Sequence, residues 1–161
     1  MADQIYAVLI ALDGDTLLLP NTAVAEVVSR DAVKRADNAP SWLAGYVDWN
    51  NRRVPAVRFE ILNGAEAVAS TRRERAVIIN SVGVHLPGGA LAIVAQGYPH
   101  LVTLNRLALK PQPNRDRDRS DLVLSRVKIA SQEALIPDLE AIEQSIARAA
   151  EFGAAAAALT A

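Results

Sequence analysis

Short apolar segments separated by turn residues run along most of this sequence. Residues 5–12 and 16–19 are almost entirely apolar, and Asp13, Gly14 and Asp15 stand between them. Two apolar runs of strand length on either side of a glycine-containing turn predict a β-hairpin. Because the same alternation of runs and turns recurs along the chain, we expect a mainly β protein.

A second hairpin is predicted between residues 42 and 59. Its side chains alternate from Leu43 onward, and the chain turns back at Asn50 and Asn51, since asparagine tolerates a positive φ. Pro55 lacks an N–H for a strand ladder, which favours a sheet edge or a bulge at that point. Further strands are expected at 75–82, 90–95, 98–103, 122–130 and 134–136, whereas 24–28 fit a strand or a short helix, and 31–41 and 110–121 are expected to be solvated loops.

The end of the chain differs from the rest. Apolar residues at 135, 139, 142, 146 and 149 follow spacings of four, three, four and three, which predicts an amphipathic helix whose stripe packs on the strands. Asp138 can cap its start, and Gly153 is expected to stop it. We therefore expect one domain over residues 1–150, with subdomains 1–65 and 66–137, a helix at 138–150 and an alanine-rich tail at 151–161.

Few residues are candidates for catalysis or metal binding. The absence of cysteine excludes disulfides and thiolate chemistry, and His85 and His100 lie on different segments without nearby metal-binding patterns. Asp13 and Asp15 suit a hairpin turn better than a cation site. A net charge of −1 provides no general field for nucleic acid. We predict a protein that is not an enzyme and needs no cofactor or metal, and we expect it in the cytoplasm because the chain starts without a basic and apolar leader.

The second predicted hairpin contains the segment Gly45-Tyr-Val-Asp-Trp-Asn-Asn-Arg-Arg-Val-Pro-Ala-Val-Arg-Phe59. It is similar, in the same length, to the signature Gly-Val-Ile-Asn-Leu-Arg-Gly-x-Val-x-Pro-Val-Ile-Asp-Leu of the CheW family of chemotaxis adaptors. Segments 17–28, 75–80, 91–96 and 136–139 resemble the family's opening, its later strands and its closing Ile-Leu-Asp-Leu. The turn departs from the signature at Asn50 and Asn51, and Arg58 stands where the family has aspartate. These departures resemble the PilI and ChpC type of the family, which belongs to pilus systems.

The resemblance implies a fold and partners. The implied fold is mainly β, with two five-stranded SH3-like barrel subdomains, a hydrophobic seam and a C-terminal α-helix. The implied partners are the regulatory domain of a CheA-type histidine kinase and the cytoplasmic tip of a methyl-accepting chemoreceptor. The residues expected to bind partners are Val24, Val28, Asn50, Arg53 and Arg58, and Arg58→Asp is expected to change binding and leave the fold intact. The alternative function is a small-ligand-binding regulatory domain with its pocket in the seam.

Overall fold

The computed structural model describes residues 4–35, 37, 39–66, 73–86 and 88–160. In chain order its strands are β1 (Gln4–Ala11), β2 (Thr16–Pro20), β3 (Val24–Ser29), β4 (Val33–Lys34), β5 (Leu43–Trp49), β6 (Arg52–Val57), β7 (Arg75–Asn80), β8 (Ala90–Ala95), β9 (His100–Asn105), β10 (Leu109–Gln112), β11 (Val123–Ile129) and β12 (Gln132–Pro137). The helices are α1 (Phe59–Leu62) and α2 (Leu139–Thr160), and the short 3-10 turns are η1 (Asn21–Ala23), η2 (Arg30–Ala32) and η3 (Arg106–Ala108).

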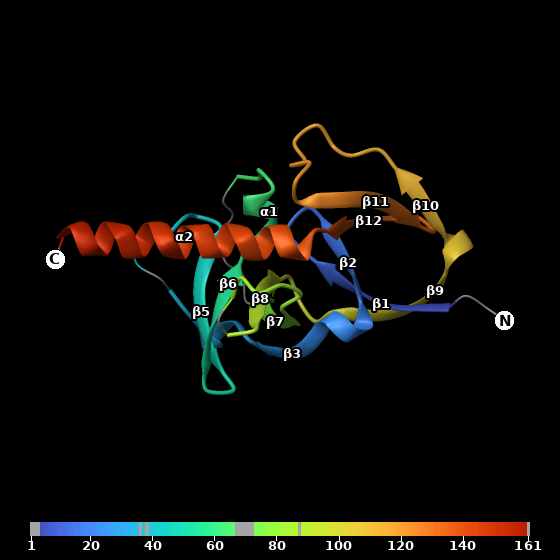
Figure 1. Cartoon of the computed structure of the whole chain (residues 1–161). Coiled ribbons are helices and arrows are strands. Elements are labelled where there is room, and N and C mark those ends of the chain that lie inside the picture. The colour runs from blue at the N-terminus through green and yellow to red at the C-terminus, as the bar shows by residue number, and fades with distance from the viewer. Residues whose placement is uncertain (1–3, 36, 38, 67–72, 87, 161) are drawn as a thin grey trace.

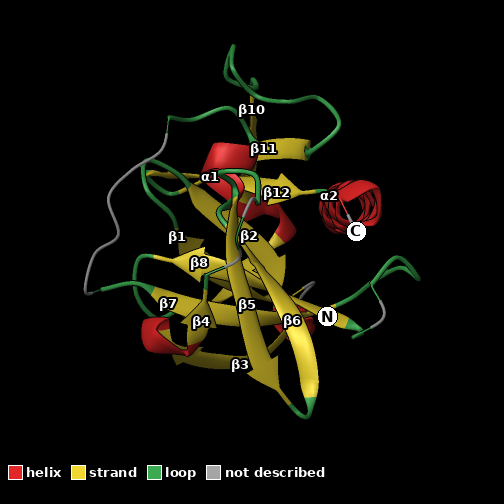
Figure 2. Cartoon of the chain, turned by 90° about the vertical axis from the view of Figure 1, so that its left-hand side faces the viewer, coloured by secondary structure: helices red, strands yellow, loops and turns green. Residues whose placement is uncertain are grey.

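The strands form two curled six-stranded sheets, seen in Figures 1 and 2. Sheet A has the order β10-β11-β12-β2-β1-β9, and sheet B has the order β3-β7-β8-β6-β5-β4. The expected mainly β fold with two barrel-like halves and a C-terminal helix is confirmed. Each sheet has six strands instead of five, because the short strands β4 and β10 lie in segments that were expected to be loops.

The two sheets do not follow the expected boundary between residues 65 and 66. Strands β1 and β2 belong with β9 to β12, and sheet B takes β3 to β8. The chain therefore leaves sheet A after the first hairpin and returns to it after β8. Hairpin patterns show which neighbouring strands pair, but they carry no information on which sheet a hairpin joins.

Strands at the centre of the molecule are buried on both faces. On β7, Ala76 and Ile78 lie in the interior of sheet B, whereas Val77 and Ile79 face the contact between the two sheets. Strands β8 and β1 alternate in the same way. These strands read as continuous apolar runs because neither face meets water.

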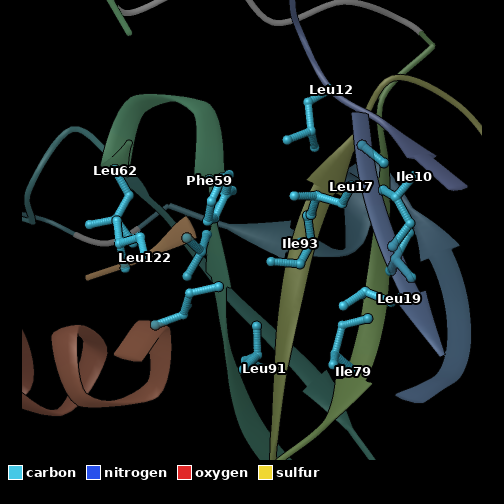
Figure 3. Close-up of a cluster of buried hydrophobic side chains, with 14 of the residues drawn as sticks. Ile10, Leu12, Leu17, Leu19, Phe59, Leu62, Ile79, Leu91, Ile93 and Leu122 are labelled. Atoms are coloured by element: carbon cyan, nitrogen blue, oxygen red, sulfur yellow. The ribbon is translucent and has the colours of Figure 1, made fainter. Parts of the chain in front are cut away.

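The contact between the sheets is the largest apolar core of the protein. We call it the seam (Figure 3). It combines residues of both sheets with α1 and α2, and its fully buried members include Ile10, Leu17, Phe59, Ile79, Leu91, Ile93, Leu122, Leu135 and Ile142. The hydrophobic seam that the family resemblance implies is therefore present.

Local turn and strand predictions hold where the sequence signal is strong. Asn50 and Asn51 both have positive φ, at 50° and 60°, so β5 and β6 are joined by a two-residue turn of the type that favours right-handed strand twist. Residues 24–28, which fitted either a strand or a helix, lie in β3. Pro55 pairs with Tyr46 on one side, and β8 joins β6 only from Ala56 onward, so Pro55 needs no donor.

Helix α2 extends beyond its expected end. Ile142 and Ile146 are buried in the seam and Leu139 packs against it, as the apolar stripe predicts. The Ala141 N–H donates to the Asp138 carboxylate at 3.2 Å, which confirms the cap. The expected stop at Gly153 is wrong, because the helix continues to Thr160. Alanine has the highest helix propensity, and a run of it offsets the roughly 1 kcal/mol that a single glycine costs.

A buried arginine joins three distant segments. Arg126 on β11 is fully buried and donates to both oxygens of Asp118, at 2.6 and 2.8 Å, and to both oxygens of Asp15, at 2.8 and 3.1 Å. Asn63, next to α1, also donates to Asp118 at 3.0 Å. The loop expected to be solvated at 110–121 is therefore anchored, since Asp118 has no exposed side-chain surface.

Replacing Arg126 by methionine should strongly destabilise the protein. The change leaves Asp118 buried without a counter-charge, and it leaves Asp15 with only the longer contact to Arg115 at 3.8 Å. Breaking a buried ion pair in this way costs about 3–5 kcal/mol. Lys34→Met is the control, because Lys34 pairs with Asp48 on the open surface and should contribute less than about 1 kcal/mol. Urea unfolding measures both free energies. Similar losses of unfolding free energy for the two variants would contradict the structural role of the Arg126 ion pairs.

The Asp118 ion pair should also make stability depend on pH. Hydrogen bonds from Arg126 lower the pKa of Asp118 from 3.8 to about 2. An acid whose pKa is lower in the folded state stabilises it above its ordinary pKa and loses that effect as the pH falls toward the folded value. The difference in unfolding free energy between wild type and Asp118→Asn should therefore shrink between about pH 5 and about pH 2. A free-energy difference that stays constant over this pH range would show that the pKa of Asp118 is not lowered by folding.

Candidate partner-binding surface

Four of the five residues expected to bind partners are accessible on sheet B. Val24 and Val28 are half-buried on β3, which is an edge strand. Val24 packs partly against the seam and Val28 partly against the interior of sheet B. Asn50 lies at the exposed tip of the β5–β6 hairpin, and Arg53 is exposed on β6.

A side-chain contact brings the hairpin tip to β3. The Trp49 indole N–H donates a hydrogen bond to the carboxylate of Glu26 at the middle of β3. Trp49 is half-buried and packs partly against the interior of sheet B, so this contact holds the hairpin across the open side of the curled sheet. Glu26 and Trp49 are 23 positions apart in the chain, so no spacing pattern in the sequence connects them. We call Val24, Glu26, Val28, Trp49 and Asn50 the tip surface.

Arg53 lies on the other face of the hairpin from Trp49. It is paired with Asp48, and successive residues of a strand point to opposite faces. The Arg53 guanidinium lies 5.1 Å from the centre of the Tyr46 ring, a cation–π distance. Lys34 on the neighbouring strand β4 donates to Asp48 of the hairpin at 2.6 Å, and this hydrogen bond lowers the pKa of Asp48. The Trp49–Glu26 contact therefore brings the turn at Asn50 close to β3, whereas Arg53 lies on the opposite face of the hairpin.

Arg58 is mostly buried and paired inside the protein, unlike the other four residues that were expected to bind partners. It follows β6, and its guanidinium donates to both oxygens of Glu74, at 2.6 and 3.3 Å. Glu74 has no exposed side-chain surface and Arg58 has 16%, and the hydrogen bond that Arg58 donates to Glu74 raises the pKa of Arg58. Gln96 donates to the same carboxylate at 3.2 Å. The charge reversal relative to the family signature is therefore matched inside this chain by Glu74.

The remaining polar candidates have structural contacts. Asp15 pairs with Arg126, which accounts for one of the two acidic turn residues. His85 lies 3.3 Å from a Glu140 oxygen on α2, and His100 is exposed on β9. Among the described residues, no group of three His, Asp or Glu side chains is arranged to hold a metal ion. In the same part of the chain, no helix is both long enough and apolar enough to cross a membrane.

The seam is filled by side chains and does not resemble a ligand pocket. Ile10, Leu17, Phe59, Leu91 and Ile93 all lie in it with 0% exposure (Figure 3). The cavities of sheet B lie elsewhere, beside η2 and at the end of β3. The expectation that a ligand-binding protein of this fold would hold its ligand in the seam is therefore wrong.

Two curled six-stranded sheets joined by an apolar seam define a double-barrel β scaffold. Residues 7–147 match the CheW-like domain, so the chain belongs to the CheW-like family. The crystal structure of the scaffolding protein TtCheW from Thermoanaerobacter tengcongensis is similar, with a TM-score of 0.69, 15% identity and coverage of 86% of each chain. At this identity the likeness shows the fold alone. Among curated proteins, none matches this chain significantly.

The Arg58→Asp variant should fold poorly, in contrast to the expectation from the sequence. It places a second carboxylate beside the buried Glu74 carboxylate and removes two of its hydrogen bonds, which should cost about 3–5 kcal/mol. Replacing both residues by methionine should recover most of this loss, because an apolar pair leaves no buried charge. Chemical unfolding measures the effect, with the exposed Arg53→Asp as the control. Equal midpoints for Arg58→Asp and Arg53→Asp would show that the ion pair has no structural role.

Proposed function

We propose that this protein is a non-catalytic cytoplasmic adaptor that couples methyl-accepting chemoreceptors to a CheA-type histidine kinase. The observation that carries the proposal is the match of residues 7–147 to the CheW-like domain. The fold likeness to the scaffolding protein TtCheW supports it. An adaptor of this kind acts by geometry: it holds two partners in one assembly, so that a conformational change in one biases the other.

The proposed binding region on sheet B consists of the tip surface together with Arg53. The tip surface combines half-buried valines on an edge strand with a polar turn and an indole, which is the mixed composition of a protein interface. Arg53 adds a positive charge on the opposite face of the hairpin, so the hairpin can contact a second molecule there. Arg58 contributes as a positioning residue, because it fixes the end of β6 through Glu74.

We place the adaptor in a pilus-type chemosensory system, as the PilI and ChpC resemblance suggests. The support is the pair of departures from the family signature, Asn50-Asn51 in the turn and Arg58 in place of aspartate. The amides of the turn cannot form the bidentate contacts of the arginine that they replace. A partner of this chain must therefore differ at the surface that meets the turn.

Charge reversals on the two faces of the hairpin test the proposal. Glu26→Lys alters the tip surface and Arg53→Glu the opposite face, and both positions are exposed. We expect at least one of them to weaken binding to a purified kinase regulatory domain or receptor tip about tenfold or more, since a charge at an interface changes affinity and partner choice. Calorimetric titration measures binding, and circular dichroism checks folding.

Lys110→Glu is the matched control for these variants. Lys110 is exposed on β10 in sheet A, and the change reverses one charge outside the proposed region. It should leave both affinities unchanged. If Glu26→Lys and Arg53→Glu bind both partners as tightly as wild type, or if the control weakens binding equally, the proposed region is wrong.

A further inference from the structure

A cavity at the end of the β5–β6 hairpin away from its tip has the composition of a ligand site. Its volume is about 630 Å³, within the usual range for small-molecule pockets. It lies between η2 and β4 on one side and the start of β5 on the other, and Arg58 and Glu74 also line it. Gly45 lets these walls approach, because a Cβ at this position would lie 2.0 Å from the Lys34 carbonyl oxygen.

Two guanidinium groups in this cavity have unused hydrogen-bond donors. Glu74 is the only acceptor for the Arg58 guanidinium among the described residues, and it takes two of the five N–H donors. Arg58 is nevertheless held rigidly, because its partner is fully buried. Arg35 is exposed at the cavity and makes no hydrogen bond or ion pair with a described residue. A fixed arginine and an available one are suited to binding a planar anion between them.

The charge of the cavity and the side chains of its walls indicate which class of ligand it can bind. Three arginines and two carboxylates line it, which leaves a formal charge of +1 and matches a monoanion. Val33, Leu43 and Val94 form an apolar part of the wall. A ligand that satisfies both parts has one carboxylate and an apolar body.

We propose that this cavity binds the carboxylate of a small amphipathic molecule or of a protein side chain, with Arg35 and Arg58 as its donors. The apolar wall receives the carbon chain next to the carboxylate. The site uses none of the residues of the tip surface, and it shares only Arg58, the positioning residue, with the proposed partner-binding region.

The first test is titration of the full-length protein with hexanoate, followed by amide chemical shifts in NMR spectra. We expect saturable binding that shifts residues around β4 and the start of β5. Arg35→Gln should weaken it about tenfold or more, since a hydrogen bond to a charged group contributes roughly 1.5–3 kcal/mol. Arg35 is exposed, so this variant should fold normally. Hexanol, which has the same apolar body without the charge, should not bind, and inorganic phosphate should bind more weakly than hexanoate.

Lys110→Gln controls for the loss of one positive charge, because Lys110 lies on sheet A away from the cavity. Its affinity for hexanoate should equal that of wild type. A short peptide with blocked ends and a single glutamate distinguishes the two sources of the carboxylate: tighter binding than hexanoate assigns the site to a protein partner, and weaker binding assigns it to a small molecule. The proposal is overturned if hexanoate shows no saturable binding at millimolar concentration, or if Arg35→Gln and Lys110→Gln have the same effect.

Discussion

Burial of the central strands on both faces is the constraint on which the structure depends. Ile79 on β7 and Leu17 on β2 lie in one core although they belong to different sheets. Each of these strands sends its alternate side chains into its own sheet, where small residues such as Ala76 and Ala92 fit the narrow interior. Neither sheet can therefore keep its apolar surface from water without the other, and α2 covers the seam with Ile142 and Ile146.

The seam leaves the functions of the protein to its outer surfaces. Because the interior is filled, other molecules can reach only the outer surface, which on sheet B includes the hairpin tip, β3 and the cavity beside β4. The Arg58–Glu74 pair lies between these regions and holds the end of β6 to the segment before β7.

The sequence predicts local features well and distant contacts poorly. The Asn50-Asn51 turn, the first hairpin and the apolar stripe of α2 depend on neighbouring residues, so their patterns are visible in the chain. The pairing of Arg126 with Asp15 joins residues 111 positions apart, and no spacing rule connects them. For the same reason the sequence does not show that Arg58 pairs with Glu74, which lies 16 residues later in the chain. The family signature matches the segment that forms the β5–β6 hairpin, but it does not show which of the side chains of that hairpin are exposed.

Differential scanning calorimetry tests most directly whether the seam joins both sheets into one unit. If the seam joins both sheets, we expect a single unfolding transition whose calorimetric enthalpy equals its van't Hoff enthalpy. We also expect Leu17→Ala, which removes seam side-chain volume from sheet A, to lower the temperature of that whole transition. Two resolved transitions, or a Leu17→Ala effect confined to part of the heat absorption, would show that the sheets unfold separately and would contradict the central role of the seam.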